Sequence, residues 1–215
     1  MSSVYFMRHA ESASNTTPHL IGGRQNDVPL TAFGEEQAVA RGQAMKRQLI
    51  KPNIVAVSPA LRTRDTARLT LGEMEYRGKV YIDPDLQELS QGKFEGQVRE
   101  EVWTAEREAE AALLGKECAL PGGESVAALG ERMYAAARRL DGLAQQSEYA
   151  RSYNHMYLPP HALAVTHEMA IKALVALIED RDQTWARKTR LPNASLTRIT
   201  FTERSERVDF LGLTY

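Results

Sequence analysis

The stretch Val4-Tyr5-Phe6-Met7-Arg8-His9-Ala10-Glu11 stands almost at the start of the chain, and the interpretation of the rest depends on it. Its first half is a short apolar run, which is typical of a buried β-strand. An arginine and a histidine follow where that strand ends. A neutral imidazole can attack phosphorus, and a neighbouring guanidinium can hold phosphoryl oxygens through two hydrogen bonds. The pair alone is a weak signal, because Arg-His dipeptides also arise by chance.

Strand-like and helix-like patterns alternate along the 215 residues, which favours an α/β fold with a mainly parallel sheet. We expect strands at 3–7, 53–57, 80–82, 162–166, 195–201 and 208–211. We expect helices at 31–49, from 58, at 98–114, from about 124 and at 169–178. The sequence therefore predicts a three-layer α/β/α sandwich with one mostly parallel sheet. We expect a single domain, 1–215, with a small helical insertion near 93–125.

Two of these helices carry a clear pattern. In the helix capped by Thr31, the small residues Gly34, Ala38 and Gly42 share one face, which predicts a close approach to the sheet. In the helix from about Glu124, apolar residues recur at a spacing of three and four, which predicts a long amphipathic helix. Its buried stripe is expected to be Val126, Leu129, Met133, Ala136, Leu140 and Leu143.

Composition excludes several classes of function. The formal net charge is −1, so there is no basic field to bind nucleic acid. The single cysteine, Cys118, leaves no internal disulfide and is typical of a reducing compartment. No apolar run is long enough to span a membrane, and the start of the chain does not resemble a signal peptide. We expect a cytoplasmic monomer or homodimer, with the tyrosine-rich segment 145–160 as a dimer contact rather than a substrate lid.

Charged and polar residues follow three of the expected strands. Arg8 and His9 follow the first, Ser58 and Arg62 follow the second, and His167 follows the strand at 162–166. Open α/β sheets bind ligands outside the carboxyl ends of their strands, and helix N-termini there favour anions. We therefore expect two histidines and two arginines to converge on one crevice, and a phosphate group to be the occupant.

The same residues lack the spacing of a metal site. His167-Glu168 does not begin a zinc-binding His-Glu-x-x-His helix, because Ile171 stands where the second histidine is required. Arginines and imidazoles can supply the positive charge instead. We expect neither a metal nor another cofactor.

Further motifs, in the right order, identify a family. The chain resembles the histidine phosphatase superfamily, with its phosphoglycerate-mutase-like fold, along nearly its whole length. Arg8-His9-Ala10-Glu11-Ser12 is similar to the Arg-His-Gly-Glu-Thr/Ser signature of that family. The remaining similar blocks are Asp27-Val28-Pro29-Leu30-Thr31, Ser58-Pro59-Ala60-Leu61-Arg62-Thr63, Leu86-Gln87-Glu88 with Gly92-Lys93-Phe94-Glu95-Gly96, Pro121-Gly122-Gly123-Glu124-Ser125, Val165-Thr166-His167 and Pro192-Asn193-Ala194-Ser195.

The resemblance implies a role for each matching residue. His9 would be the nucleophile and form a phosphohistidine. Arg8, Arg62 and His167 would bind the phosphoryl oxygens, and Asn15 would contact the same group. Glu88 would protonate the leaving oxygen and later help to activate water. Glu88 must then be protonated for part of the cycle, so we expect burial or the nearby phosphate to raise its pKa.

Two residues depart from the family pattern. Ala10 replaces the usual glycine after the nucleophile, so the turn there must tolerate a side chain. Glu168 replaces the usual small residue after the second histidine. Its carboxylate either points away from the phosphate, caps its own helix or meets a cationic or hydroxyl-bearing part of the substrate. Gly22 and Gly23 either let the backbone approach the substrate or simply make a turn.

The expected activity is hydrolysis of a small phosphomonoester through phosphohistidine. The first alternative is a cofactor-dependent phosphoglycerate mutase, which would return the phosphoryl group to a second hydroxyl. Such mutases typically have a longer insertion after the acid block, whereas 96–121 is short here. The second alternative is a non-catalytic regulatory module that binds a small phosphorylated molecule or inorganic phosphate. Acidic residues and Trp103 at 93–117 favour an uncharged or partly cationic leaving group over a second phosphate.

Overall fold

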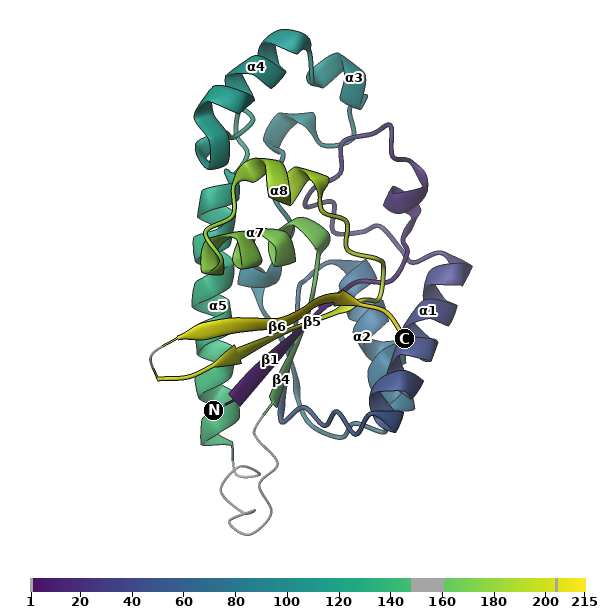
Figure 1. The fold of residues 1–215 in the computed structure, drawn as a ribbon. Coiled ribbons are helices and arrows are strands. Elements are labelled where there is room, and N and C mark those ends of the chain that lie inside the picture. Colours follow the sequence, from purple (N-terminus) through teal and green to yellow (C-terminus); the bar gives the residue numbers. More distant parts are fainter. Residues whose placement is uncertain (1, 148–160, 204) are drawn as a thin grey trace.

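A six-stranded sheet forms the centre of the protein (Figure 1). The computed structural model describes residues 2–147, 161–203 and 205–215. The strand order is β3-β2-β4-β1-β5-β6, in which β3, β2, β4 and β1 are parallel and β5 and β6 pair antiparallel. The strands are β1 (Ser2–Arg8), β2 (Ile54–Val57), β3 (Val80–Ile82), β4 (His161–Thr166), β5 (Leu196–Phe201) and β6 (Glu206–Leu213). The predicted mostly parallel sheet is confirmed.

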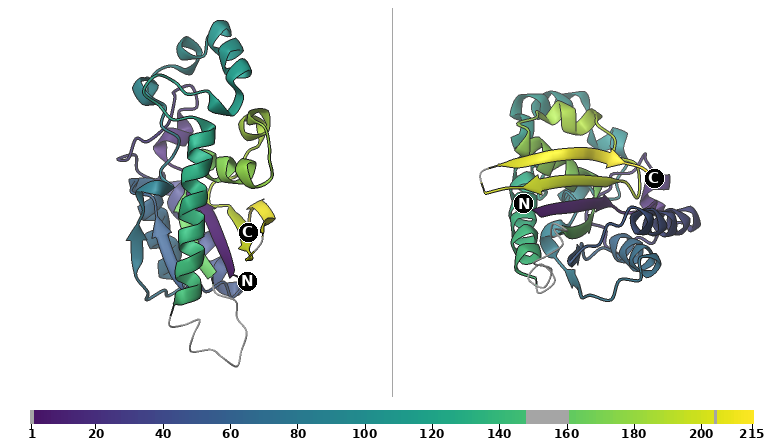
Figure 2. Two further views of the ribbon diagram at one scale, coloured as in Figure 1. Left: turned by 90° about the vertical axis from the view of Figure 1, so that its left-hand side faces the viewer. Right: turned by 60° about the horizontal axis from the view of Figure 1, so that its bottom comes forward.

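Helices cover both faces of this sheet, as the three-layer prediction requires (Figures 1 and 2). The longer helices are α1 (Ala32–Arg47), α2 (Leu61–Glu73), α5 (Val126–Gln146) and α7 (Glu168–Ile178). Alternate residues of β1 face opposite layers, since side chains alternate along a strand. Val4 and Phe6 belong to the core cluster under α5 and α7, whereas Tyr5 and Met7 belong to the one under α1 and α2.

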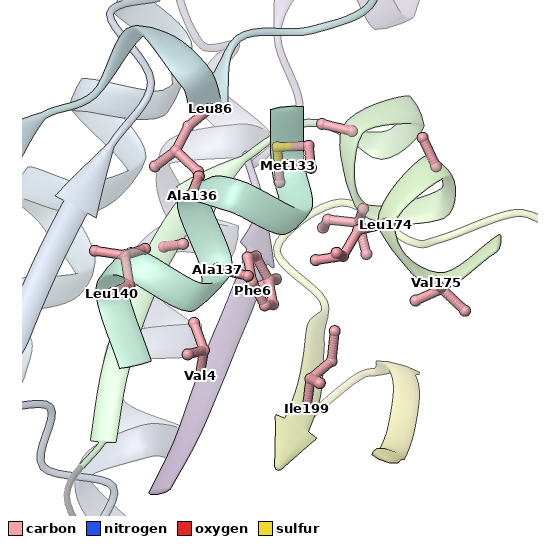
Figure 3. Packing of buried hydrophobic residues seen from close by; sticks show 14 of the residues in the cluster. Val4, Phe6, Leu86, Met133, Ala136, Ala137, Leu140, Leu174, Val175 and Ile199 are labelled. Atoms are coloured by element: carbon pink, nitrogen blue, oxygen red, sulfur yellow. The ribbon is translucent and has the colours of Figure 1, made fainter. Parts of the chain in front are cut away.

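The core under α5 follows the expected amphipathic stripe up to Leu140 (Figure 3). Beyond that point the prediction is wrong. Ala144 is buried, whereas Leu143 is 44% exposed. An α-helix turns once every 3.6 residues. At this end of α5, the residue four positions after Leu140 therefore returns to the buried face, and the residue three positions after it does not.

The helices differ from the expectation in three further places. α2 begins at Leu61 rather than at Ser58-Pro59, because the Ser58 hydroxyl bonds to His167 instead of capping the helix. The helix expected at 98–114 is broken into α3 (Arg99–Val102) and α4 (Ala105–Leu114). Thr104 ends the continuity, because its hydroxyl caps α4 at the Arg107 N–H. α8 (Gln183–Lys188) was not expected.

The segment near 93–125 lies beyond the carboxyl ends of the strands, with α3 and α4 at the top of Figure 1. It contains α3, α4 and three-residue helical turns at Gly92–Phe94 and Gly115–Glu117. Ile21, Val102 and Leu120 form a separate small core beneath it. The expected tyrosine-rich dimer contact falls mainly on 148–160, outside the described residues. In the described part of the chain, no helix is long and apolar enough to cross a membrane.

The small residues of α1 approach α2 and a backbone segment rather than the sheet. A Cβ on Gly34 would stand 1.9 Å from the Glu11 carbonyl oxygen, and one on Gly42 would stand 2.4 Å from the Thr70 carbonyl oxygen. The close approach was predicted, but the partner was not. The contact holds the segment after His9 against α1, so it helps to position the residues that follow β1.

Gly34→Ala is therefore expected to lower the free energy of unfolding by about 1–3 kcal/mol, because backbone must move to admit the methyl group. Gly142→Ala is the matched control: it also lies inside a helix, and nothing stands within 4 Å of its Cβ position. That variant is expected to stabilise the protein by about 0.5–1 kcal/mol. Urea unfolding of both variants measures the difference, and equal effects would contradict the close contact at Glu11.

Candidate active site

Three neighbouring parallel strands, β2, β4 and β1, end at the same edge of the sheet. The residues directly after them are Ser58, His167 and His9. Backbone hydrogen bonds extend the register one residue past the strands: the His9 N–H donates to the Thr166 carbonyl at 2.9 Å, and the Ser58 N–H to the Val165 carbonyl at 3.0 Å. The predicted convergence of strand ends is thus built by the sheet itself.

His9 is 5% exposed, and its Nδ1 lies 2.7 Å from the carbonyl oxygen of Ala10. A carbonyl only accepts, so Nδ1 carries the proton and Nε2 keeps a free lone pair. Ala10 has no positive φ, and it packs with Ala38 and Ala194. Alanine in place of the usual glycine therefore strains nothing at this turn.

His167 lies in the middle of the site and is 1% exposed. Its Nε2 is 2.8 Å from the Ser58 hydroxyl. Its Nδ1 is buried and has no hydrogen-bond partner among the described residues. A buried, unpaired ring nitrogen is costly unless a ligand satisfies it.

The rings of His9 and His167 are 5.3 Å apart between centroids, at 66° to one another. Burial lowers the pKa of both imidazoles well below 6.5, and the charges of Arg62 and Arg8 lower it further. Both rings are therefore neutral at neutral pH. A neutral His9 is a nucleophile without any prior loss of a proton.

Arg8 is held by a carboxylate rather than left free beside His9. Its Nη1 pairs with Glu168 Oε2 at 3.0 Å and donates to the Leu191 carbonyl, while its Nε is buried and without a partner among the described residues. Glu168 also pairs with Lys172 at 3.2 Å and accepts the Leu191 N–H at 3.3 Å. The orientations expected for Glu168 did not include this one, in which its carboxylate pairs with two cations of the protein itself.

Arg62, on the first turn of α2, is 4% exposed. Its guanidinium donates to two carbonyls of the loop before α1, that of Gly23 at 3.0 Å and that of Gln25. Gly23 thus contacts an arginine of the site through its backbone and has a φ of +149°. Gly22 has nothing within 4 Å of its Cβ position, and the structure gives it no contact in the site.

Asn15 lies in the helical turn at Ala13–Thr16 and is tied to the backbone of His9. Its Oδ1 accepts from the Ser12 N–H at 3.0 Å and from Asn193 Nδ2 at 3.2 Å. Asn193 Nδ2 also donates to the His9 carbonyl at 3.1 Å. The Asn15 amide is therefore oriented with its acceptor engaged, so the NH₂ group is the part that can bind an anion.

Glu88 reaches the N-terminus of α7, directly after His167. Its Oε1 accepts the N–H groups of Leu89 at 2.8 Å and Ala170 at 3.1 Å, and its Oε2 accepts that of Met169 at 3.2 Å. Burial raises the pKa of Glu88, and these backbone hydrogen bonds and the charge of Arg62 oppose that rise. The raised pKa agrees with the expectation for this carboxyl.

Charged residues behind Glu88 were not predicted as part of the site. Arg24 donates to the Glu88 carbonyl at 3.1 Å and pairs with Glu124 at 3.0 Å. Arg132 pairs with Glu124 at 2.7 Å and donates to the Gln87 carbonyl at 3.1 Å. The Glu124 block noted in the sequence thus fixes the backbone that carries Glu88. Within the described ranges, no group of three or more His, Cys, Asp or Glu side chains is arranged to hold a metal ion.

Comparison with known proteins agrees with this geometry. Residues 4–214 match the model of the histidine phosphatase superfamily (branch 1), so the chain belongs to that family. It is 32% identical over 205 residues to the probable phosphoglycerate mutase GpmB of Yersinia enterocolitica, covering 94% of this chain and 86% of that protein. It is 31% identical over 205 residues to the protein of the same name from Escherichia fergusonii.

Solved structures share the fold. Mycobacterial hydrolase 1 superimposes with a TM-score of 0.80 at 21% identity, covering 99% of each chain. Mycobacterial glucosyl-3-phosphoglycerate phosphatase, solved with VO3, gives 0.79 at 22% identity and the same coverage. The α-ribazole phosphatase of Shigella flexneri gives 0.73 at 22% identity, covering 98% of this chain and 96% of that one. The predicted phosphoglycerate-mutase-like α/β fold is confirmed.

Proposed function

We propose that this protein hydrolyses a small phosphomonoester in two steps, through a phosphohistidine on Nε2 of His9. The observation that carries the proposal is the environment of that ring: a neutral, buried imidazole with Nδ1 engaged, beside a second neutral imidazole and two arginines. Phosphoryl transfer needs positioning and charge stabilisation above all, and these groups supply both.

In the first step, Nε2 of His9 forms a bond to phosphorus as the bond to the leaving oxygen breaks. Arg8, Arg62 and the Nδ1–H of His167 bind the phosphoryl oxygens, together with the amide of Asn15. Glu88 gives its proton to the leaving oxygen, so that an alcohol departs. In the second step, Glu88 takes a proton from water, which attacks phosphorus and releases inorganic phosphate and free His9.

The two carboxylates near the site have different environments, which separates their roles. Glu168 is paired with two cations of the protein, Arg8 at 3.0 Å and Lys172 at 3.2 Å. Glu88 has a raised pKa, and a phosphate dianion nearby would raise it further. Its Oε2 accepts one hydrogen bond and keeps a lone pair for a proton. Glu88 is therefore the acid, and Glu168 orients Arg8 rather than contacting the substrate.

The names of related proteins support phosphoryl chemistry on a small molecule. Two of the structural neighbours are phosphatases solved with inorganic phosphate or phosphoserine bound. The curated relatives, in contrast, are named as probable mutases. A mutase is thus the second candidate, favoured by those names. Against it stands the short segment between Gly96 and Pro121, which provides only α3, α4 and one further helical turn to enclose a second orientation of the substrate.

Product analysis separates the two candidates. With 3-phosphoglycerate, with or without its 2,3-bisphosphate, the expected result is slow release of inorganic phosphate and no 2-phosphoglycerate above the uncatalysed background. A broad phosphomonoester panel is expected to reveal a better substrate. Rapid formation of 2-phosphoglycerate dependent on the bisphosphate would replace the hydrolase by a mutase. No turnover on any substrate would favour the non-catalytic phosphate-binding module.

Glu168→Gln is expected to raise KM for a phosphomonoester by about 10-fold and to change kcat less, because Arg8 loses its orienting charge. Lys172→Met, which leaves the Arg8–Glu168 pair in place, is expected to have a smaller effect. Glu75→Gln is the matched control, since it breaks an exposed ion pair with Lys46 of 2.7 Å, far from the site. Steady-state kinetics with all three variants provide the measurement. An unchanged KM in Glu168→Gln would show that Arg8 needs no such partner.

A further inference from the structure

Arg41, on α1, is the largest fully buried side chain among the described residues. Its Nε donates to the Ala194 carbonyl at 2.6 Å, and its Nη2 donates to the Leu213 carbonyl at 2.8 Å. Its Nη1 is buried and has no hydrogen-bond partner in the described part of the chain. Within the same ranges, no Asp or Glu side chain pairs with this guanidinium.

A buried cation without a carboxylate is costly for the folded state. Burial lowers the pKa of Arg41 to about 10, and an electrostatic interaction with Tyr215 opposes that shift, so the group is still charged at neutral pH. The Tyr215 ring lies 4.8 Å from the Arg41 guanidinium carbon, a contact that offsets a small part of the cost. An arginine that costs stability at this place points to a role in the site.

Ala194, which accepts the Arg41 Nε–H, has a φ of +55°. This left-handed backbone conformation is unfavourable for a residue with a side chain, so it persists only where surrounding contacts hold it. The Ala194 methyl group packs with Ala10 and Ala38. Arg41 adds the hydrogen bond that fixes the direction of the Ala194 carbonyl.

The strained backbone at Ala194 is bonded to the end of β1. The Ala194 N–H donates to the His9 carbonyl at 3.3 Å, and Nδ2 of Asn193 donates to the same carbonyl at 3.1 Å. The same Nδ2 donates to Asn15 Oδ1 at 3.2 Å. A change of backbone conformation at Ala194 would therefore shift both the His9 carbonyl and the Asn15 amide.

The Leu213 carbonyl gives the guanidinium a second fixed point. It belongs to β6, whose end lies beside α1 (Figures 1 and 2). A planar guanidinium can donate to two carbonyls at a set angle, whereas a lysine ammonium is a single point charge. Arg41 thus joins α1, β6 and the turn before β5 at one place.

We propose that Arg41 is a positioning residue for the reaction: it holds the left-handed backbone at Ala194, and through it the end of β1 that carries His9. It acts through backbone carbonyls and does not bind the phosphoryl group. The effect on turnover rests on the proposed function, whereas the hold on the turn at 193–195 does not.

Arg41→Met is expected to lower kcat about 10-fold to 10²-fold, because a small displacement of catalytic groups is enough for such a loss. The melting temperature is expected to stay within about 5 °C of wild type, since removal of the unpaired charge offsets the two lost hydrogen bonds. Arg47→Met is the matched control: it removes the same charge from an exposed position of the same helix and should leave kcat unchanged.

Adding Ala194→Gly to Arg41→Met tests the route of the effect. Glycine adopts the left-handed conformation without strain, and for alanine that strain corresponds to a factor of about 5–30 in the conformational equilibrium. The double variant is expected to recover kcat by about that factor. A residue that only stabilised the fold would lower the melting temperature and leave the kcat of the folded protein unchanged.

Hydrogen exchange measured by mass spectrometry gives a readout that needs no turnover. In Arg41→Met, the amides of 193–195 are expected to exchange at least about 5-fold faster, while those of β4 keep their wild-type rates. If Arg41→Met does not fold, Arg41→Lys replaces it in all three measurements, because lysine keeps the charge but cannot bond to both carbonyls.

Two results would overturn the positioning role: wild-type kcat in a folded Arg41 variant, or no recovery of kcat on adding Ala194→Gly. Unchanged exchange at 193–195 would overturn the hold on the turn. If the wild-type protein turns over no substrate, the proposed function fails, and exchange at 193–195 alone then decides whether Arg41 holds this turn.

Discussion

Replacing His9 by alanine is expected to lower kcat at least about 10³-fold and to abolish any phosphorylated form of the enzyme. In the proposed mechanism Nε2 of His9 forms the bond to phosphorus, and among the described residues no neighbouring side chain is placed to substitute for it. His167 is the nearest alternative, but its Nε2 is engaged with the Ser58 hydroxyl at 2.8 Å. Rapid quenching with labelled substrate should show an acid-labile label on wild-type protein and none on the variant.

His161→Gln is the matched control for this experiment. His161 begins β4 and His167 follows its end, so the two histidines lie at opposite edges of the sheet. The His161 ring packs edge-on against Tyr5 at 5.3 Å and contacts no residue of the site. Its replacement is expected to leave kcat unchanged. If His9→Ala retained activity within about tenfold of wild type, the covalent step would be ruled out.

The residues that follow strands, and Arg62 on the first turn of the helix after one, were predictable. Those that reach the site from further along a helix were not. His9 and His167 follow apolar runs that are readable as strands, and parallel strands bring their ends together whatever packs around them. Lys172 and Arg132 lie on helices, and only the packing of α7 and α5 decides which way their side chains point. Lys172 had one local signal, since it stands four residues after Glu168 on the same helix face.

The misplaced boundaries have a related cause. Ser58-Pro59 has the local pattern of a helix start, yet the serine hydroxyl is used by a histidine more than a hundred residues away. At Trp103-Thr104 the charged pattern continues, but the Thr104 hydroxyl caps a new helix and the backbone turns. In both places a single side-chain hydrogen bond decides where the helix begins. It outweighs the helix propensity of the local sequence, which contributes only a small free energy per residue.

The Glu88 carboxyl is expected to set the alkaline limit of phosphoenzyme formation. Below its raised pKa it carries a proton for the leaving oxygen, so kcat/KM should fall as the pH rises through that pKa. At the acid end, kcat/KM should fall when His9 becomes protonated. Since burial lowers the pKa of His9, that limb is expected well below pH 6.5. The profile is therefore bell-shaped and displaced to acid pH.

Glu88→Gln is expected to lower kcat/KM for an alkyl phosphate by about 10²–10⁴-fold and to remove the alkaline limb, because an amide has no proton to give. For an aryl phosphate whose leaving group needs no protonation, the loss should be much smaller. That difference separates acid catalysis from a structural defect, which would impair both substrates equally. Glu124→Gln serves as the comparison: it loosens the Arg24 and Arg132 contacts behind Glu88 but keeps the acid, so its alkaline limb should remain.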